Sequence, residues 1–271
     1  MNLQEKVALV TGAGSGIGQA TAIELTERGV KAIGLVDRSE NVLRVARQLN
    51  DLRGGPVAEG IVGDTTDPAF RRRTFDLLCS KYGIPAILVP AAGITRDQLA
   101  VKIDKETGKA QIYSEDTFRL VLEVNLVSPV FWALEMVARI AEDRYRRNLK
   151  RWHPDEGITG TIIFIGSVSS QGNPGQISYA ATKAGLEGAA STLAKEARFY
   201  GVRSAVIHPG FTDTPMVRAL GEDFIKEHIL PHTQLGRLIQ PEEIADAIYF
   251  LISNSAVSGE LWADAGWHPS A

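Results

Sequence analysis

The stretch Val7-Ala-Leu-Val-Thr-Gly-Ala-Gly-Ser-Gly-Ile-Gly18 decides the fold of this chain. Its first four residues are apolar and β-prone, and four glycines then follow within seven residues. Residues 17–28 carry apolar side chains at helical spacing. The stretch therefore predicts a strand, a glycine turn and a helix. In that context a glycine-rich turn favours a nucleotide site over a plain tight βα turn.

The rest of the chain alternates apolar, β-prone runs with helical patterns. The further expected strands are 32–36, 57–62, 86–89, 161–165, 202–208 and 261–263, and the further expected helices are 40–49, 67–82, 116–146, 179–200 and 244–252. Strands that alternate with helices pair in parallel through right-handed crossovers, so both faces of the sheet must be covered. We expect an α/β fold with a Rossmann-like, doubly wound parallel sheet of about seven strands.

A single domain over residues 1–271 is expected, because the chain contains no repeat, low-complexity tract or linker. Two segments interrupt the alternation. Residues 101–113 are typical of a small surface hairpin or loop, and residues 142–157 are rich in charge. We expect both to be solvated excursions, with a partner surface or a substrate wall as the alternative.

Bulk composition points to a small-molecule partner. The net charge is −3 with acids and bases interspersed, so we expect neither nucleic acid nor a membrane surface as a partner. No apolar run approaches the ~20 residues needed to span a bilayer. A single cysteine, Cys79, is incompatible with an internal disulfide framework or a cysteine-rich zinc site, and no metal is expected. With no signal-peptide core at residues 1–6, the expected location is the cytoplasm.

The glycine loop has the composition of a pyrophosphate site. Gly12 allows a sharp turn, while Gly16 and Gly18 let an anion approach the main chain and the helix pack closely. Amide groups at the start of the helix, including those of Ser15 and Ile17, and the helix dipole would face that anion.

Two carboxylates follow the next strands. Asp37 ends the second strand, where it can accept hydrogen bonds from both ribose hydroxyls of an adenosine and would repel a 2′-phosphate. It favours NAD over NADP, although the neighbouring Arg38 has the opposite charge preference. Asp64, after the third strand, is placed to bind the adenine amino group beside Val62 or Gly63. The alternative for Asp64 is an ordinary turn carboxylate.

Tyr179 and Lys183 are four residues apart on one expected helix. Tyrosine has a pKa near 10, so it serves as an acid or base at neutral pH only when a neighbouring cation stabilises its anion. The pair therefore indicates proton transfer at a carbonyl or alcohol oxygen.

These motifs together resemble one family, the single-domain short-chain dehydrogenase/reductases. The resemblance runs from Lys6 to the C-terminus. The shared motifs are Thr11-Gly-x-x-x-Gly-x-Gly18, Asp64, Ala91-Ala-Gly93, Asn125, Ser167, Tyr179-x-x-x-Lys183 and Pro209-Gly210. Within the family, Gly93-Ile-Thr-Arg-Asp97, Gly172-Asn-Pro-Gly-Gln176 and Pro209-Gly-Phe211 look most like 3-oxoacyl-[acyl-carrier-protein] reductases and their hydroxysteroid or hydroxyacyl dehydrogenase relatives.

The resemblance implies a catalytic tetrad. Tyr179 would be the acid/base, while Lys183 would lower the pKa of Tyr179 and hold the nicotinamide ribose. Ser167 would donate a hydrogen bond to the substrate oxygen, and the backbone of Asn125 would bind a water that relays protons.

The resemblance also implies further cofactor contacts, a lid and an assembly. Gly93, Pro209, Gly210, Thr212 and Thr214 would contact the cofactor. Residues 212–237 would form a variable substrate lid in which Met216, Leu220, Phe224 and Ile225 line a pocket or form a buried stripe. A homotetramer is expected through the two long helices and the last strand.

Two departures from the family pattern stand out. Pro90-Ala91 replaces the usual Asn-Asn, so backbone contacts or other groups must hold this segment. Ser167 lies 12 residues before Tyr179, one fewer than expected, which leaves Ser169 as a second candidate for its role.

Three functions remain open on the sequence. The first is an NAD(H)-dependent oxidoreductase that interconverts a secondary alcohol and a ketone, working in the oxidising direction. The second is a 3-oxoacyl-thioester reductase that meets an acidic carrier through arginines near the pocket mouth, for which the candidates are Arg139, Arg144, Arg146, Arg147 and Arg198. The third is a catalytically silent dinucleotide-binding regulator.

Overall fold

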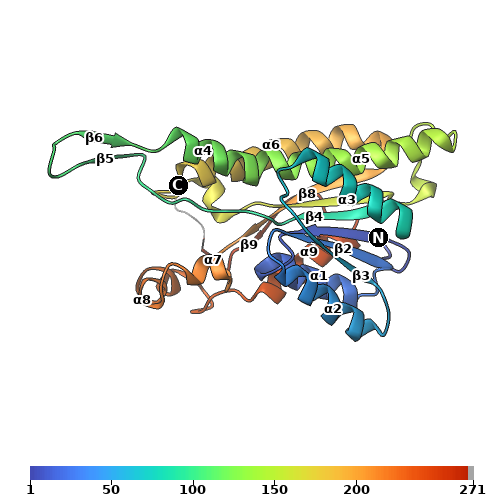
Figure 1. Cartoon of the computed structure of the whole chain (residues 1–271), viewed down its shortest axis with the longest axis horizontal. Coiled ribbons are helices and arrows are strands. Elements are labelled where there is room, and N and C mark those ends of the chain that lie inside the picture. Colours follow the sequence, from blue (N-terminus) through green and yellow to red (C-terminus); the bar gives the residue numbers. More distant parts are fainter. Residues whose placement is uncertain (268–271) are drawn as a thin grey trace.

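A computed structural model describes residues 1–267, and the last four residues of the expected 1–271 domain lie outside that range. Its centre is a parallel sheet of seven strands in the order β3-β2-β1-β4-β7-β8-β9 (Figure 1). The strands are β1 (Val7–Thr11), β2 (Ala32–Asp37), β3 (Ala58–Val62), β4 (Pro85–Pro90), β7 (Gly160–Ile165), β8 (Val202–Pro209) and β9 (Gly259–Ala263). The expected Rossmann-like sheet is confirmed. Its strand order reverses between β1 and β4, where doubly wound sheets open a ligand crevice.

Helices cover both faces of the sheet (Figure 1). One layer consists of α1 (Gly16–Glu27), α2 (Asn41–Arg53) and α9 (Pro241–Ser253), and the other consists of α3 (Pro68–Lys81), α4 (Glu115–Leu122), α5 (Ser128–Arg146) and α6 (Ile177–Glu196). Strand residues alternate between the two cores. Ala8 and Val10 pack with α1, α2 and α9, whereas Leu9 packs with α3, α5 and α6.

The longest helical run is Glu115–Arg146, in which the π-helical turn Glu123–Val127 joins α4 to α5. Its mean hydropathy over the most apolar window is 1.6, so length and composition alone would let it cross a membrane. The expectation that no apolar segment reaches that length is therefore wrong for this helix. Trp132 and Met136 are fully buried against the sheet, which identifies it as a core helix.

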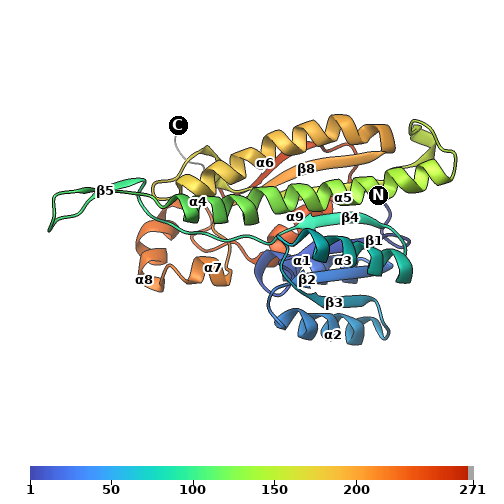
Figure 2. The same ribbon diagram turned by 45° about the horizontal axis from the view of Figure 1, so that its top comes forward.

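Residues 101–113 form the expected hairpin. Strands β5 (Val101–Ile103) and β6 (Ala110–Ile112) pair antiparallel and project from the body in both views (Figures 1 and 2). The Tyr113 hydroxyl anchors the base of the hairpin, because it donates to the Arg96 carbonyl at 2.7 Å and lies 2.9 Å from the Ser178 hydroxyl. The hairpin therefore starts from the same end of α6 as the candidate site.

The charge-rich segment 142–157 joins the end of α5 to the start of β7, at the amino edge of the sheet. It folds back on the protein. The Trp152 indole donates to the Gly157 carbonyl at 2.7 Å, and the buried Arg144 pairs with Glu156 at 2.6 Å. This placement excludes the segment as a substrate wall, because ligands of such sheets bind at the carboxyl edge.

The expected lid region contains short helical turns. These are α7 (Pro215–Arg218), α8 (Glu222–Phe224), a π-helical turn (Ile225–Ile229) and a 3-10 turn (Leu230–His232). Ile225, Ile229 and Leu238 bury one another in a small cluster of their own, separate from the two main cores.

Candidate active site

A cavity of about 430 Å³, called here the large cavity, lies at the carboxyl ends of β1–β4. It occupies the strand-order reversal at which a dinucleotide would be expected. Of the residues proposed from the sequence, its walls contain Gly12, Ser15, Gly16, Ile17, Gly18, Asp37, Asp64, Gly93, Tyr179, Lys183 and Thr214. The fold thus gathers on one cavity residues that are far apart in the chain.

The glycine loop forms one wall of the large cavity by close main-chain contact. Gly12 has φ +66°, and a Cβ there would lie 2.7 Å from the Ala92 nitrogen. A Cβ on Gly18 would lie 2.2 Å from the Gly12 carbonyl oxygen. Helix α1 begins with Ser15 as a cap that makes no side-chain bond, and its first turn carries no acidic residue. Its first amides therefore remain available to an anion, which fits a dinucleotide pyrophosphate.

Asp37 borders the large cavity at the end of β2. Its two oxygens accept hydrogen bonds from the amides of Gly14 and Ser39, each at 2.9 Å, and these bonds fix the carboxylate toward the loop. Arg38 also lines the cavity. Asp64 is exposed at the rim and accepts from the Thr66 amide and hydroxyl, both at 2.8 Å.

The segment after β4 is held without the usual asparagine pair. The Ala91 amide donates to the Thr11 carbonyl at 3.1 Å, and the Ala92 amide donates to the Thr11 hydroxyl at 3.3 Å. Pro90 is tolerated in this central strand because the pairing of β4 with β7 ends at Leu88. Thr11 therefore supplies the hydrogen bonds that connect β1 to the segment after β4.

The Asn125 side chain also holds this segment, through two hydrogen bonds. Its carboxamide accepts from the Ile94 amide at 2.9 Å and donates to the Ile94 carbonyl at 2.8 Å. The residue is fully buried in the π-helical turn Glu123–Val127. Such turns shift carbonyls out of the α-helical pattern and are frequent at functional sites. The hydrogen bonds of the side chain thus explain an asparagine inside a helix.

Tyr179 stands in the first turn of α6 and faces the end of β7. Burial raises the pKa of Tyr179 to about 12, an effect that the Ser167 hydroxyl opposes by hydrogen bonding and the Asp97 charge reinforces. The contact with Tyr179 favours Ser167 over Ser169 as the partner hydroxyl. Ser167 also caps the following 3-10 turn by accepting from the Ser169 amide at 3.0 Å. At neutral pH the phenol is protonated and can donate.

Lys183 lies one helical turn further along α6. Its ammonium donates to the Ile165 carbonyl at 2.7 Å and sits 5.3 Å from the centre of the Tyr179 ring. Burial lowers the pKa of Lys183 to about 8. The sequence predicted that this cation would lower the pKa of Tyr179. In the protein alone, the pKa of Tyr179 is instead raised, chiefly because the phenol loses hydration on burial.

A smaller pocket of about 120 Å³ adjoins the large cavity, with Tyr179 on the border between them. Ser167, Pro209, Gly210 and Thr212 line this small pocket together with apolar side chains. Of the lid residues considered, Met216 and Leu220 line it, whereas Ile225 is buried in the lid cluster and Phe224 is exposed. Sequence reasoning did not propose several other lining groups, among them Val168, Phe211, Asp97 and Gln176.

None of the five arginines considered for a carrier surface lines either pocket. Arg139, Arg144, Arg146 and Arg147 lie toward or just beyond the C-terminal end of α5, and each is in an ion pair with a nearby carboxylate. The large cavity contacts the same helical run at Val124, so Arg146 is roughly 33 Å away at 1.5 Å per residue. Arg198 follows the other end of α6, away from Tyr179. The predicted cationic mouth is therefore wrong for these residues.

Comparison with known proteins agrees with this geometry. Residues 6–224 match the family model described as short chain dehydrogenase. The chain is 38% identical over 263 residues to the 3-oxoacyl-[acyl-carrier-protein] reductase of Escherichia coli (strain K12), covering 96% of both chains. It is 35% identical over 264 residues to the reductase of the same name from Thermotoga maritima, again covering 96% of both.

Solved structures give the same fold. The crystal structure of 3-ketoacyl-(acyl-carrier-protein) reductase from Brucella melitensis complexed with NADH has a TM-score of 0.79 at 24% identity, covering 98% of this chain and all of that one. A short-chain type dehydrogenase/reductase from Mycobacterium marinum has a TM-score of 0.82 at 24% identity, covering 98% and 96%. By its sequence motifs, its fold and its match to the family model, the chain belongs to the short-chain dehydrogenase family and is an oxidoreductase.

Proposed function

We propose that this protein reduces a ketone to a secondary alcohol, and catalyses the reverse reaction, with Tyr179 as the proton donor and acceptor. The observation that carries the proposal is the place of Tyr179, which stands on the border of the two cavities beside the Ser167 hydroxyl. A phenol there can protonate an oxygen whose carbon faces the large cavity. A nicotinamide dinucleotide bound in the large cavity supplies or accepts the hydride.

The remaining residues bind and orient. Ser167 donates to the substrate oxygen, which holds the oxygen near the phenol. Lys183 binds ribose hydroxyls through its ammonium, and the backbone of Asn125 binds a water that passes protons toward Lys183. On the cofactor side, the glycine-loop amides hold the pyrophosphate, Asp64 holds the adenine, and Gly93 lies beside the dinucleotide. Pro209, Gly210, Thr212 and Thr214 position the carboxamide end.

The protonation state of Tyr179 in the free protein suits the reduction step. A phenol with a pKa of about 12 is protonated across the physiological range, which suits donation to a developing alkoxide. Oxidation requires the phenolate, and nothing within the described residues lowers the pKa of Tyr179 below its ordinary value. This differs from the oxidising direction that Asp37 suggested through NAD preference.

We propose NAD(H) as the preferred cofactor. Asp37 is held at the end of β2 by the Gly14 and Ser39 amides, so its charge cannot swing away from a 2′-phosphate. Repulsion there would weaken NADP binding. Arg38 opposes this preference because it borders the same cavity.

A 3-oxoacyl thioester is the substrate class that the relatives favour, since curated proteins 34–38% identical to this chain carry that reductase name. The apolar side chains of Val168, Phe211 and Leu220 suit an acyl chain in the small pocket. A catalytically silent regulator is less well supported, because Tyr179 lies between Ser167 in the small pocket and Lys183 in the large cavity, although Asn125 is buried and lines neither.

We also propose a homotetramer in the cytoplasm. Phe131 and Leu134 on α5 are 47% and 42% exposed, and Ile177 at the start of α6 is 47% exposed, so the two helices present an apolar face that a second copy would cover. Size-exclusion chromatography with light scattering measures the assembly, and a monomer at micromolar concentration would remove this part of the proposal.

The test is a screen of acetoacetyl thioesters, ketones and secondary alcohols with NADH, NADPH and their oxidised forms, followed by nicotinamide absorbance. We expect the fastest turnover with a 3-oxoacyl thioester and NADH.

Tyr179→Phe should lower kcat by about 10²–10⁴-fold while NADH binding is retained. The matched control is Tyr145→Phe, because Tyr145 is 84% exposed on α5 and should leave kcat unchanged. Equal turnover by Tyr179→Phe and the parent would refute the assigned role.

A further inference from the structure

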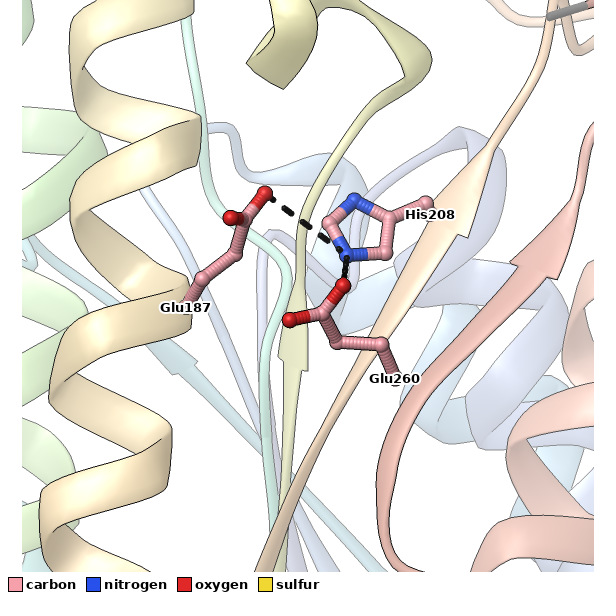
Figure 3. Close-up of side chains that lie close together, drawn as sticks. All are labelled: Glu187, His208 and Glu260. Carbon is pink, nitrogen blue, oxygen red and sulfur yellow. Dashed lines mark ion pairs between the residues drawn. The ribbon is translucent and has the colours of Figure 1, made fainter.

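A second cluster of functional groups lies behind the catalytic residues, on the same face of the sheet as α6. His208 near the end of β8 points its Nε2 atom at two carboxylates, Glu187 from α6 and Glu260 from β9 (Figure 3). One donor atom from each of the three residues lies within 4.8 Å of the other two. The three residues come from separate elements, so their meeting is a product of the tertiary fold.

The distances in this cluster do not suit direct hydrogen bonds. His208 Nε2 is 3.5 Å from a Glu260 oxygen and 3.9 Å from a Glu187 oxygen, whereas good N–H···O bonds are about 2.7–3.2 Å long. They do suit a shared cation. Three ligands at about 2.0–2.2 Å from a tetrahedral zinc ion are roughly 3.4 Å apart.

Among the described residues, the Nε2 atom of His208 is buried without a hydrogen-bond partner. The side chain is fully buried, and within residues 1–267 its Nε2 atom accepts and donates no hydrogen bond. Buried polar atoms without a partner are uncommon, because each loses its hydration without compensation. In the same described range, neither Glu187 nor Glu260 forms an ion pair with a lysine or arginine. Two carboxylates therefore face each other with only the imidazole between them.

The opposite ring nitrogen already has the neighbour that a metal-bound histidine requires. His208 Nδ1 lies 3.2 Å from the Ser167 carbonyl oxygen and 3.3 Å from the Ser167 amide nitrogen, so Ser167 offers this nitrogen both an acceptor and a donor. Metal binding through Nε2 would select the tautomer in which Nδ1 donates to the carbonyl. A histidine that binds a metal through Nε2 carries its proton on Nδ1 and usually donates it to a carbonyl or carboxylate. Trp262 stacks on the imidazole at 4.2 Å and holds the ring in this plane.

We propose that Glu187, His208 and Glu260 bind one divalent transition-metal ion, with zinc as the reference ion. One imidazole and two carboxylates form a mixed nitrogen and oxygen ligand set suited to zinc or manganese. The glutamate side chains are 31% and 40% exposed, so an ion can enter from solvent and water can complete its coordination. Because His208 also contacts the backbone of Ser167, the ion would fix the imidazole tautomer beside a catalytic hydroxyl.

The experiment is a zinc titration of the full-length protein after chelator treatment, in competition with a chromophoric chelator. We expect one equivalent of zinc per chain and a rise in melting temperature on loading. Cobalt in place of zinc should give visible absorption bands typical of four or five ligands that include nitrogen. These readouts need no substrate or nicotinamide cofactor, so their outcome is independent of the proposed reaction.

Three variants locate the ion. Glu187→Gln and Glu260→Gln keep side-chain size at partly exposed positions, and each should weaken zinc binding by at least about tenfold. Glu196→Gln, at the exposed end of the same helix, is the matched control and should bind as the parent does. His208→Asn should abolish the cobalt bands. If that buried substitution does not fold, the two glutamine variants still decide the question.

Two results would overturn the proposal. One is the absence of stoichiometric zinc binding at concentrations up to the millimolar range. The other is binding that persists unchanged in the Glu187→Gln, Glu260→Gln double variant, because the ion would then occupy a different site.

Discussion

The glycine-loop wall of the large cavity, residues 11–18, is built from main chain, whereas the opposite wall, formed by α6 and the lid, is built from side chains. In the first wall, added Cβ atoms at Gly12 and Gly18 would meet backbone atoms at 2.7 and 2.2 Å. In the second, the side chains of Tyr179, Lys183 and Met216 determine what the wall can bind. The first wall should therefore tolerate almost no substitution, and the second should change its chemistry without losing its shape.

The largest expected effect is that of Gly18→Ala. The added methyl group meets the Gly12 carbonyl, and the main chain must move to relieve the contact. We expect a loss of about 3 kcal/mol of stability or more and no saturable NADH binding. Thermal unfolding and NADH fluorescence titration measure the two effects.

Gly188→Ala is the matched control for that substitution. Gly188 lies on α6 with no atom within 4 Å of an added Cβ, so alanine should stabilise the helix by roughly 0.5–1 kcal/mol. If Gly18→Ala behaves like Gly188→Ala, the contrast between the two walls is wrong.

Asp37→Asn tests the charged side chain that is hydrogen-bonded to the glycine-loop wall. The amide oxygen can still accept from the Gly14 amide, so the loop should keep its shape while the charge disappears. We expect the ratio of kcat/KM with NADPH to kcat/KM with NADH to rise at least about tenfold. Glu40→Gln, three residues further along and exposed, should leave the ratio unchanged. An unchanged ratio in Asp37→Asn would assign the cofactor preference to another residue.

A pH profile tests the side-chain wall. Burial lowers the pKa of Lys183 to about 8, so its ammonium is present below that pH and is lost above it. Tyr179, with a pKa of about 12, stays protonated over the same interval. We expect kcat/KM for ketone reduction to be halved near pH 8 and then to fall about tenfold per pH unit.

Lys183→Arg identifies the group responsible for that decline. A guanidinium keeps its charge throughout the range, so whatever activity remains should lose the break near pH 8. A break that survives in this variant belongs to another group.

The smallest effect is expected in the lid. Leu220 lines the small pocket while 41% exposed, so Leu220→Ala should raise KM for an acyl substrate by a few-fold, equivalent to about 1 kcal/mol. Phe224→Ala removes a larger side chain that lies outside the pocket and should leave KM as it is. Steady-state kinetics with thioesters of increasing chain length separate the two variants. Equal KM values for both would place the acyl chain elsewhere.

Much of the fold and site was predictable from local pattern. The run Val7-Ala-Leu-Val10 is buried on both faces of the sheet, and the glycines after it lie where a pyrophosphate would bind. Asn125, Ser167, Tyr179 and Lys183 meet near one cavity although three separate segments carry them. Apolar periodicity and turn composition are local properties, so they can be read without knowing the rest of the molecule.

Other properties depended on neighbours that are distant in the sequence. Thr11 and Asn125 hold the segment that follows Pro90, which no local pattern indicated. The arginines considered for a carrier surface lie at the far end of the helices, because position along a helix fixes distance from the site. In the sequence, His208 is one polar residue in an otherwise apolar strand. Only the fold brings Glu187 and Glu260 close to its Nε2 atom.

The sequence by itself predicted the doubly wound sheet, the glycine-loop site and the acid/base role of Tyr179 beside Lys183, because each prediction rests on the type and spacing of residues close together in the chain. Only the tertiary structure decided the protonation of that pair, the boundary between the two pockets and the cluster around His208. Burial and charge are sums over atoms from many elements, and lost hydration is the largest effect on the pKa of both Tyr179 and Lys183.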